Sequence, residues 1–134
     1  MAFKFGKLEV WKLSVDYIDA VYAIAEQLPD HERYNLASQL TRAATSVALN
    51  IAEGSTGQTD AEQARFLGLV LRSLVETVAC QHLISRRDYL SDPEPLRALY
   101  RQSEYLARKL QAMRNTLAPD KPWLREAAER DYGA

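Results

Sequence analysis

Residues 39–54 have the sequence QLTRAATSVALNIAEG, and this stretch indicates a long amphipathic helix. Leu40, Ala43, Val47 and Ile51 recur at helical spacing and form an apolar line along it. Polar side chains follow a second line, and their spacings of 3, 4, 4 and 3 place them on one helical face. The members of this polar line are Gln39, Arg42, Ser46, Asn50 and Glu53.

Start and stop signals on either side of this stretch define further helices. The predicted helices cover about residues 7–27, 32–53, 60–88 and 93–116. The signals are an N-cap at Asp30, a left-handed stop at Gly54, a capping box formed by Thr59 and Glu62, and an N-cap at Asp92.

Short links between four long helices force sequence neighbours to be antiparallel. We therefore predict an all-α protein, an antiparallel up-down-up-down four-helix bundle over residues 1–118. The chain of 134 residues is long enough to bury a core without disulfides or metal ions. Residues 119–134 are expected to form a short helix or to be disordered.

The predicted helix over residues 7–27 contains two apolar lines instead of one. The first line includes Trp11, Val15 and Tyr22, and the second includes Tyr17 and Val21. Two lines cover more surface than one neighbouring helix needs. Either the helix lies between two partners of the same bundle, or the second line meets another subunit.

Polar groups also interrupt an apolar line of the predicted helix over residues 60–88, at Ser73 and Glu76. A buried carboxylate needs a partner, because an unpaired buried charge is costly. We hypothesise that Arg42 pairs with Glu76, and that Ser46 and Asn50 complete the hydrogen bonds. One interpretation is a buried network that fixes helix register, and the other is a pocket for a ligand or for nucleic acid. The expected network consists of Gln39, Arg42, Ser46, Asn50, Glu53, Ser73 and Glu76.

The same stretches resemble the four-helix-bundle family that includes the 23S ribosomal RNA intervening-sequence proteins. The resemblance covers about residues 3–115; its densest match is Gln39–Ala44, and the run from Arg42 to Gly54 is fairly specific. A departure occurs at Arg72, where the family usually has a small residue. The other matching segments are LEVWK at 8–12, LP at 28–29, YNL at 34–36, QLTRAA at 39–44, FL at 66–67 and SLVE at 73–76.

This resemblance implies a ring-shaped homopentamer of four-helix bundles without established enzymatic activity. A more distant branch of similar proteins comprises the accessory variability proteins of diversity-generating retroelements, which work with a reverse transcriptase and bind nucleic acid. Those relatives tend to be basic, whereas the net charge of this chain is −1.

Positive charge is concentrated near the end of the chain, although the whole chain is nearly neutral. Residues 96–116 contain five Lys and Arg against Glu104 alone, a local balance of 5 − 1 = +4. Cations interleaved with Tyr100 and Tyr105 suit the backbone and bases of nucleic acid. The alternative is a solvated face with an internal Arg101–Glu104 pair. The candidate nucleic-acid-binding residues are Arg97, Arg101, Arg108, Lys109 and Arg114, with Arg86 and Arg87 as an extension.

The sequence lacks the residue patterns of catalytic and metal sites. Cys80 is the single cysteine, and neither His31 nor His82 lies in a spacing that suits a metal or a nucleophile–base pair. We therefore expect no metal, no cofactor and no enzymatic activity. Without an expected signal peptide or membrane span, we predict a cytoplasmic protein.

Two hypotheses for function follow from these features. The first is a non-enzymatic homo-oligomeric adaptor that binds RNA or DNA, or a nucleic-acid enzyme such as a reverse transcriptase, through the basic helix over residues 93–116. The second is a purely structural protein–protein interaction module that has no affinity for nucleic acid.

Overall fold

The part of the chain that the structure describes contains four long helices and no strand, which confirms the predicted all-α fold. The computed structural model describes residues 3–57 and 59–118, so the prediction for residues 119–134 lies outside the described part. The long helices are α1 (Glu9–Ala25), α2 (Leu36–Gly54), α3 (Asp60–Arg86) and α4 (Glu94–Leu117). Two 3-10 helices, η1 (Lys4–Lys7) and η2 (Asp30–Glu32), precede α1 and α2.

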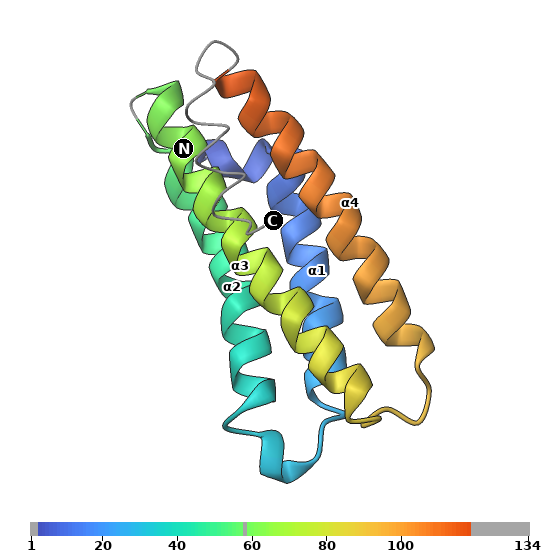
Figure 1. Ribbon diagram of the computed structural model, residues 1–134. Coiled ribbons are helices and arrows are strands. Elements are labelled where there is room, and N and C mark those ends of the chain that lie inside the picture. The colour runs from blue at the N-terminus through green and yellow to red at the C-terminus, as the bar shows by residue number, and fades with distance from the viewer. Residues whose placement is uncertain (1–2, 58, 119–134) are drawn as a thin grey trace.

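Successive long helices run in opposite directions along a common axis (Figure 1). α1 packs against α2 and α4, and α3 packs against the same two helices. This antiparallel arrangement follows from the short connections between the helices.

The second apolar line of α1 faces the core. Val10, Tyr17, Val21 and Ile24 are all buried, whereas Tyr22 of the first line is 47% exposed. The hypothesis that the second line meets another subunit is therefore wrong, because that line packs inside the bundle. The first line is the one that stays partly at the surface.

Two of the predicted N-caps are confirmed by hydrogen bonds. Thr59 Oγ1 accepts a bond of 3.1 Å from the backbone N–H of Glu62 at the start of α3. Asp92 Oδ1 accepts one of 3.0 Å from the backbone N–H of Glu94 at the start of α4. Each cap satisfies an amide that lacks a partner in the first helical turn.

The predicted cap at Asp30 and the predicted start of the second helix near residue 32 are wrong. Asp30 lies in η2, and α2 begins only at Leu36, after Asn35, whose side chain makes no capping bond. The chain is held in this short 3-10 turn because Glu32 is buried and is tied to a distant loop. Tyr89 donates a hydrogen bond of 2.7 Å to Glu32 Oε2, and Asn35 donates one of 2.9 Å to Oε1.

Gly54 ends α2, but not through the predicted left-handed conformation. Gly54 is itself the last residue of the helix and has no left-handed φ, and Ser55, the next residue, keeps a helical φ of −68°. The reason for glycine is close packing, because a Cβ atom on Gly54 would lie 2.6 Å from Cβ of Phe66 in α3. The left-handed residue is Asp88, with φ of 56°, just after α3.

By length and composition alone, α3 could cross a membrane. Its buried side chains instead form much of the bundle core, including Leu67, Val70, Leu71, Leu74 and Ile84. A helix in the core of a bundle has the same length and composition.

Candidate nucleic-acid interface

Arg97, Arg101 and Arg108 lie on the outer surface of α4, as their spacing predicts. All three residues are exposed, and the side chains of Arg97 and Arg101 are 67% and 63% exposed. The opposite side of α4 is apolar and supplies Leu99, Leu106 and Leu110 to the core. The amphipathic pattern of α4 therefore turns these cations toward solvent.

Glu94 partly neutralises the first two arginines. Arg101 Nη2 donates a hydrogen bond of 2.9 Å to Glu94 Oε1, and Arg97 Nη1 lies 4.0 Å from Glu94 Oε2. The Arg101–Glu104 pair of the alternative interpretation is wrong, because the Arg101 guanidinium binds Glu94, two helical turns earlier. Both ion pairs are exposed, so each contributes little to stability.

A second cationic group surrounds Tyr105 farther along α4. The Arg108 guanidinium lies 5.8 Å from the centre of the Tyr105 ring, and Lys109 Nζ lies 5.5 Å from it. Lys109 Nζ also lies 3.4 Å from Glu9 Oε1 of α1. The hydrogen bond to Glu9 raises the pKa of the Lys109 ammonium. Tyr105 itself is 42% exposed. This group presents a ring and cations together, an arrangement that suits nucleic acid.

The remaining predicted cations are divided between the interior and one end of the bundle. Arg114 is only 7% exposed, and its guanidinium packs over Gly68 of α3, so its assignment to the surface is wrong. Arg86 and Arg87 are exposed at the end of α3. Acidic residues accompany them in the following loop and at the start of α4, namely Asp88, Asp92 and Glu94.

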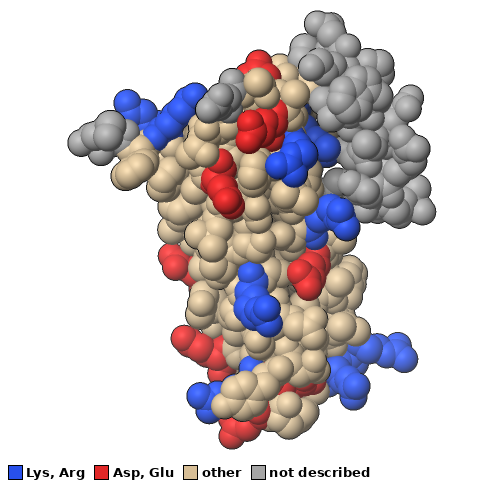
Figure 2. Space-filling view, turned by 90° about the vertical axis from the view of Figure 1, so that its left-hand side faces the viewer, with Lys and Arg blue, Asp and Glu red and all other residues tan. Residues whose placement is uncertain are grey.

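The polar line of α2 lies at the surface of the single chain, and the predicted burial is wrong for most of it. Gln39, Arg42, Glu53 and Glu76 are exposed, whereas Ser46, Asn50 and Ser73 are half-buried. The α2 residues among them line two shallow hollows at the surface, one shared with Tyr22 of α1 and the other with Glu76 of α3. In Figure 2, basic and acidic side chains are interspersed on this side of the molecule, with neutral surface between them.

Part of the expected network exists around Ser46. Ser46 Oγ lies 3.0 Å from Ser73 Oγ, and Asn50 Nδ2 donates bonds of 3.0 Å and 2.9 Å to Ser46 Oγ and to its carbonyl oxygen. Arg42 and Glu76 line the same shallow hollow. Within residues 3–57 and 59–118, however, no ion pair joins them.

A different set of polar residues forms a network in the core. The phenol oxygen of Tyr17 lies 2.7 Å from Thr77 Oγ1 and 2.7 Å from Ser103 Oγ. Gln81 Nε2 donates to Tyr17 and to Ser103, at 3.0 and 2.9 Å. All four residues are at most 3% exposed, and burial raises the pKa of the Tyr17 phenol, which therefore stays neutral.

This network joins α1, α3 and α4, and the sequence analysis missed it. A signal was present in the spacing of Leu74, Thr77, Gln81 and Ile84, which places two polar residues on the apolar line of α3. Buried polar groups with matched partners fix the register of packed helices. The network thus holds α4, with its outward cations, at one position against α1 and α3.

Cys80 lies beside this network and is 4% exposed. Burial, with a smaller contribution from Glu76, raises the pKa of its thiol. A protonated, covered thiol is a poor nucleophile. Among the described residues, no group of three or more His, Cys, Asp or Glu side chains could hold a metal ion.

The fold and surface define a small all-helical protein with four long helices, a polar bonding network inside and exposed cations on its last helix. The sequence model of the 23S rRNA-intervening sequence protein family matches residues 6–112, and the chain belongs to this family. No curated protein matches the chain.

Proposed function

We propose that this protein is a non-enzymatic, homo-oligomeric adaptor that binds nucleic acid through the outer face of α4. The observation that carries the proposal is the pair of exposed cationic groups on this helix, Arg97 with Arg101 and Arg108 with Lys109 around Tyr105. The family's name connects its members with ribosomal RNA, which supports RNA as the nucleic acid. A nucleic-acid enzyme such as a reverse transcriptase is a further partner in this proposal.

Repetition of the α4 face in an oligomer offsets its modest charge. Each subunit would contribute the same cations, so that contacts too weak alone act together on one strand. A ring of five subunits, as the family resemblance implies, is the arrangement that we propose.

The face between α1 and α2 is the proposed subunit contact. Tyr22 and Leu49 are 47% and 59% exposed, and they line one shallow hollow with polar residues of α2 around them. An exposed apolar group with a polar rim is typical of protein–protein interfaces.

The alternative function is a purely structural protein–protein interaction module. The observation that favours it is that carboxylates of the same chain partly neutralise the positive charge of α4. Glu94 and Glu9 contact three of its cations. In that function the α1–α2 face binds another protein and the α4 face is only solvated.

Charge reversal on α4 tests the adaptor against this alternative. Arg97→Glu, Arg101→Glu and Arg108→Glu together are expected to weaken the binding of labelled RNA at low salt by at least about tenfold. A matched control reverses Lys12, Arg33 and Arg65, which are exposed on other helices and loops and change the net charge equally. Binding that is equally weak in both variants, or absent in the unmodified protein, contradicts the adaptor.

The subunit contact has its own test. The mass of the protein in solution, measured by light scattering, is expected to be that of an oligomer and to fall for Leu49→Glu. Leu83→Glu is the control, because Leu83 of α3 is similarly exposed, at 52%, but lies outside the proposed contact. A monomeric mass for the unmodified protein contradicts the oligomer.

A further inference from the structure

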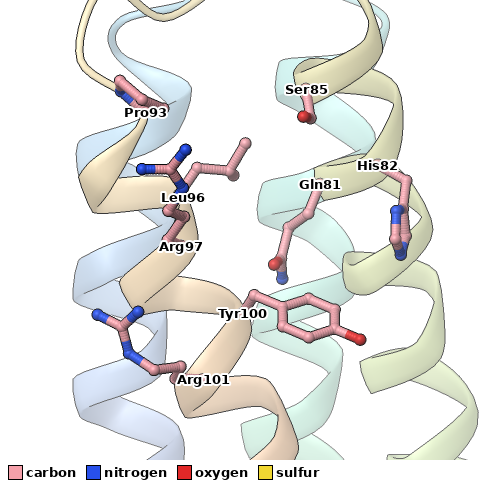
Figure 3. Close-up of a pocket in the computed structure, with 8 residues that line it drawn as sticks. All are labelled: Gln81, His82, Ser85, Pro93, Leu96, Arg97, Tyr100 and Arg101. Carbon is pink, nitrogen blue, oxygen red and sulfur yellow. The ribbon is translucent and has the colours of Figure 1, made fainter.

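A hollow of about 430 Å³ lies between the end of α3 and the start of α4. In Figure 3, Gln81 of α3 and Tyr100 of α4 extend into the space between the two helices. His82 of α3 and Leu96, Arg97 and Arg101 of α4 also line the hollow. The hollow is open to solvent along one side and mostly apolar, and it adjoins the first cationic group of α4.

Gln81 provides a polar group at the inner end of this hollow. Its side chain extends from α3 toward Tyr100 (Figure 3) and the residue is only 3% exposed. Its amide nitrogen, Nε2, donates hydrogen bonds to the Tyr17 and Ser103 oxygens, and these bonds fix the orientation of the amide. The other amide atom, Oε1, is buried and has no hydrogen-bond partner within the described residues. A buried acceptor of this kind is stabilised by any N–H donor that reaches it.

Aromatic rings form one wall of the hollow. The rings of Tyr100 and His82 meet edge to face, with centroids 5.9 Å apart and planes at 77°. Tyr100 is 41% exposed, so its ring can turn at the surface without disturbing the core. Access of a ligand to Gln81 requires such a turn, and the half-exposed ring offers an aromatic face against which a flat ligand can stack.

Arg97 and Arg101 also line the hollow, and in Figure 3 their guanidinium groups extend outward from α4, away from Gln81 and Tyr100. Glu94 balances one of these two positive charges, so the group keeps a net charge of 2 − 1 = +1. The complementary ligand is a flat heteroaromatic ring with an N–H donor, joined to a single anionic group. A nucleotide has these features, and its base is small enough for the hollow.

We propose that this hollow binds one unstacked base of single-stranded nucleic acid. The base stacks on Tyr100 and donates an N–H to Gln81 Oε1, and the adjoining phosphate contacts Arg97 and Arg101. This inference rests on the proposed function and adds a specific base site to it. It also explains how a surface of modest charge can hold a strand, because stacking contributes affinity that charge does not.

Matched oligonucleotides with and without a base test the site. A short labelled single strand and its abasic counterpart carry the same phosphates, and only the first has bases that can stack on a protein side chain. The strand with bases is expected to bind about fivefold to a hundredfold more tightly by fluorescence anisotropy. Tyr100→Ala is expected to abolish most of this difference.

Tyr34→Ala is the control, because Tyr34 is an exposed tyrosine that lies neither on α4 nor in the hollow. It should keep the preference for the strand with bases. If the abasic strand binds as tightly as the strand with bases, or if Tyr34→Ala loses the preference and Tyr100→Ala keeps it, the base site is wrong while the adaptor stands. If neither strand binds at low salt, both proposals fail.

Two further measurements show where the base binds and whether it belongs to a strand or to a free nucleotide. A strand containing bromouracil should cross-link on irradiation to the peptide that contains Tyr100, and a cross-link confined to other peptides overturns the site. A free nucleoside monophosphate should displace the strand only at concentrations far above those at which the strand binds. Tighter binding of the monophosphate than of the strand overturns the assignment to single-stranded nucleic acid.

Discussion

The phenol oxygen of Tyr17 in α1 lies 2.7 Å from the hydroxyl oxygen of Ser103 in α4, and this contact joins residues that are 86 positions apart. Thr77 and Gln81 of α3 complete the same cluster. The position of α4 therefore depends on polar bonds in the core as well as on apolar packing.

Tyr17→Phe is expected to lower the free energy of unfolding by about 1–3 kcal/mol, since it leaves buried polar groups without a partner. Urea unfolding at a fixed protein concentration measures the loss. Tyr34→Phe is the control, because Tyr34 is 85% exposed and should change stability by less than about 0.5 kcal/mol. Equal stability of the two variants would show that the network contributes nothing.

Gly54→Ala is expected to destabilise the protein by about 1–3 kcal/mol, although alanine is the better helix former. The added Cβ would lie 2.6 Å from Cβ of Phe66, so α2 and α3 must move apart. Gly6→Ala adds the same atom where no neighbour lies within 4 Å, and it should be nearly neutral. Thermal unfolding of both variants decides whether close packing is the reason for glycine, and a stabilised Gly54→Ala variant contradicts it.

Asp88→Gly is expected to stabilise the protein by about 0.5–1 kcal/mol. Asp88 follows α3 in a left-handed conformation with φ of 56°. Its backbone N–H donates a hydrogen bond to the Ser85 carbonyl oxygen, with an N···O distance of 3.0 Å. Glycine removes the steric cost and also a negative charge near the negative end of the helix dipole. Arg87→Gly should instead destabilise the protein, because Arg87 has an ordinary φ of −79°. Chemical unfolding measures both changes, and a loss of stability for Asp88→Gly would contradict this description of the helix end.

Acid is expected to weaken the contact between Glu32 and Tyr89. The hydrogen bond from Tyr89, followed by the one from Asn35, lowers the pKa of the Glu32 carboxyl, and the bond to Glu32 raises the pKa of Tyr89. A lowered carboxyl pKa means that the stabilisation is complete above the unfolded value of about 4.3 and is lost as the pH falls through the folded value. A raised tyrosine pKa keeps the contact intact up to about pH 10.

The difference in stability between the unmodified protein and Tyr89→Phe should therefore be constant from about pH 5 to pH 9 and should shrink below about pH 4. Urea unfolding across this range measures it. A difference that grows toward acid pH would contradict the assignment of the Glu32 charge.

The number of helices and most of their limits could be predicted because the signals are local. Thr59 and Asp92 cap their helices through bonds to backbone groups two or three residues away. The start of α2 could not be predicted in this way. It depends on Glu32, whose partner Tyr89 is 57 residues distant.

The candidate site could be predicted only in part for a similar reason. Helical spacing places Arg97, Arg101 and Arg108 on one face, and they are exposed as expected. Spacing does not say which neighbour covers a face, so the polar line of α2 was assigned to the interior and Arg114 to the surface. In the structure Gln39, Arg42 and Glu53 of that line are exposed, whereas Arg114 is buried against Gly68 of α3. The hollow beside Gln81 joins two helices, and no local pattern predicts it.

The dependence of RNA affinity on salt tests the central claim most directly. If the cations of α4 bind phosphates, the logarithm of the affinity for single-stranded RNA should fall linearly with the logarithm of salt concentration. Replacing Arg97, Arg101 and Arg108 by Glu should then make the slope less negative by about 2 for each subunit that contacts the strand. A slope near zero, or the same slope for the unmodified and the charge-reversed protein, would contradict the account.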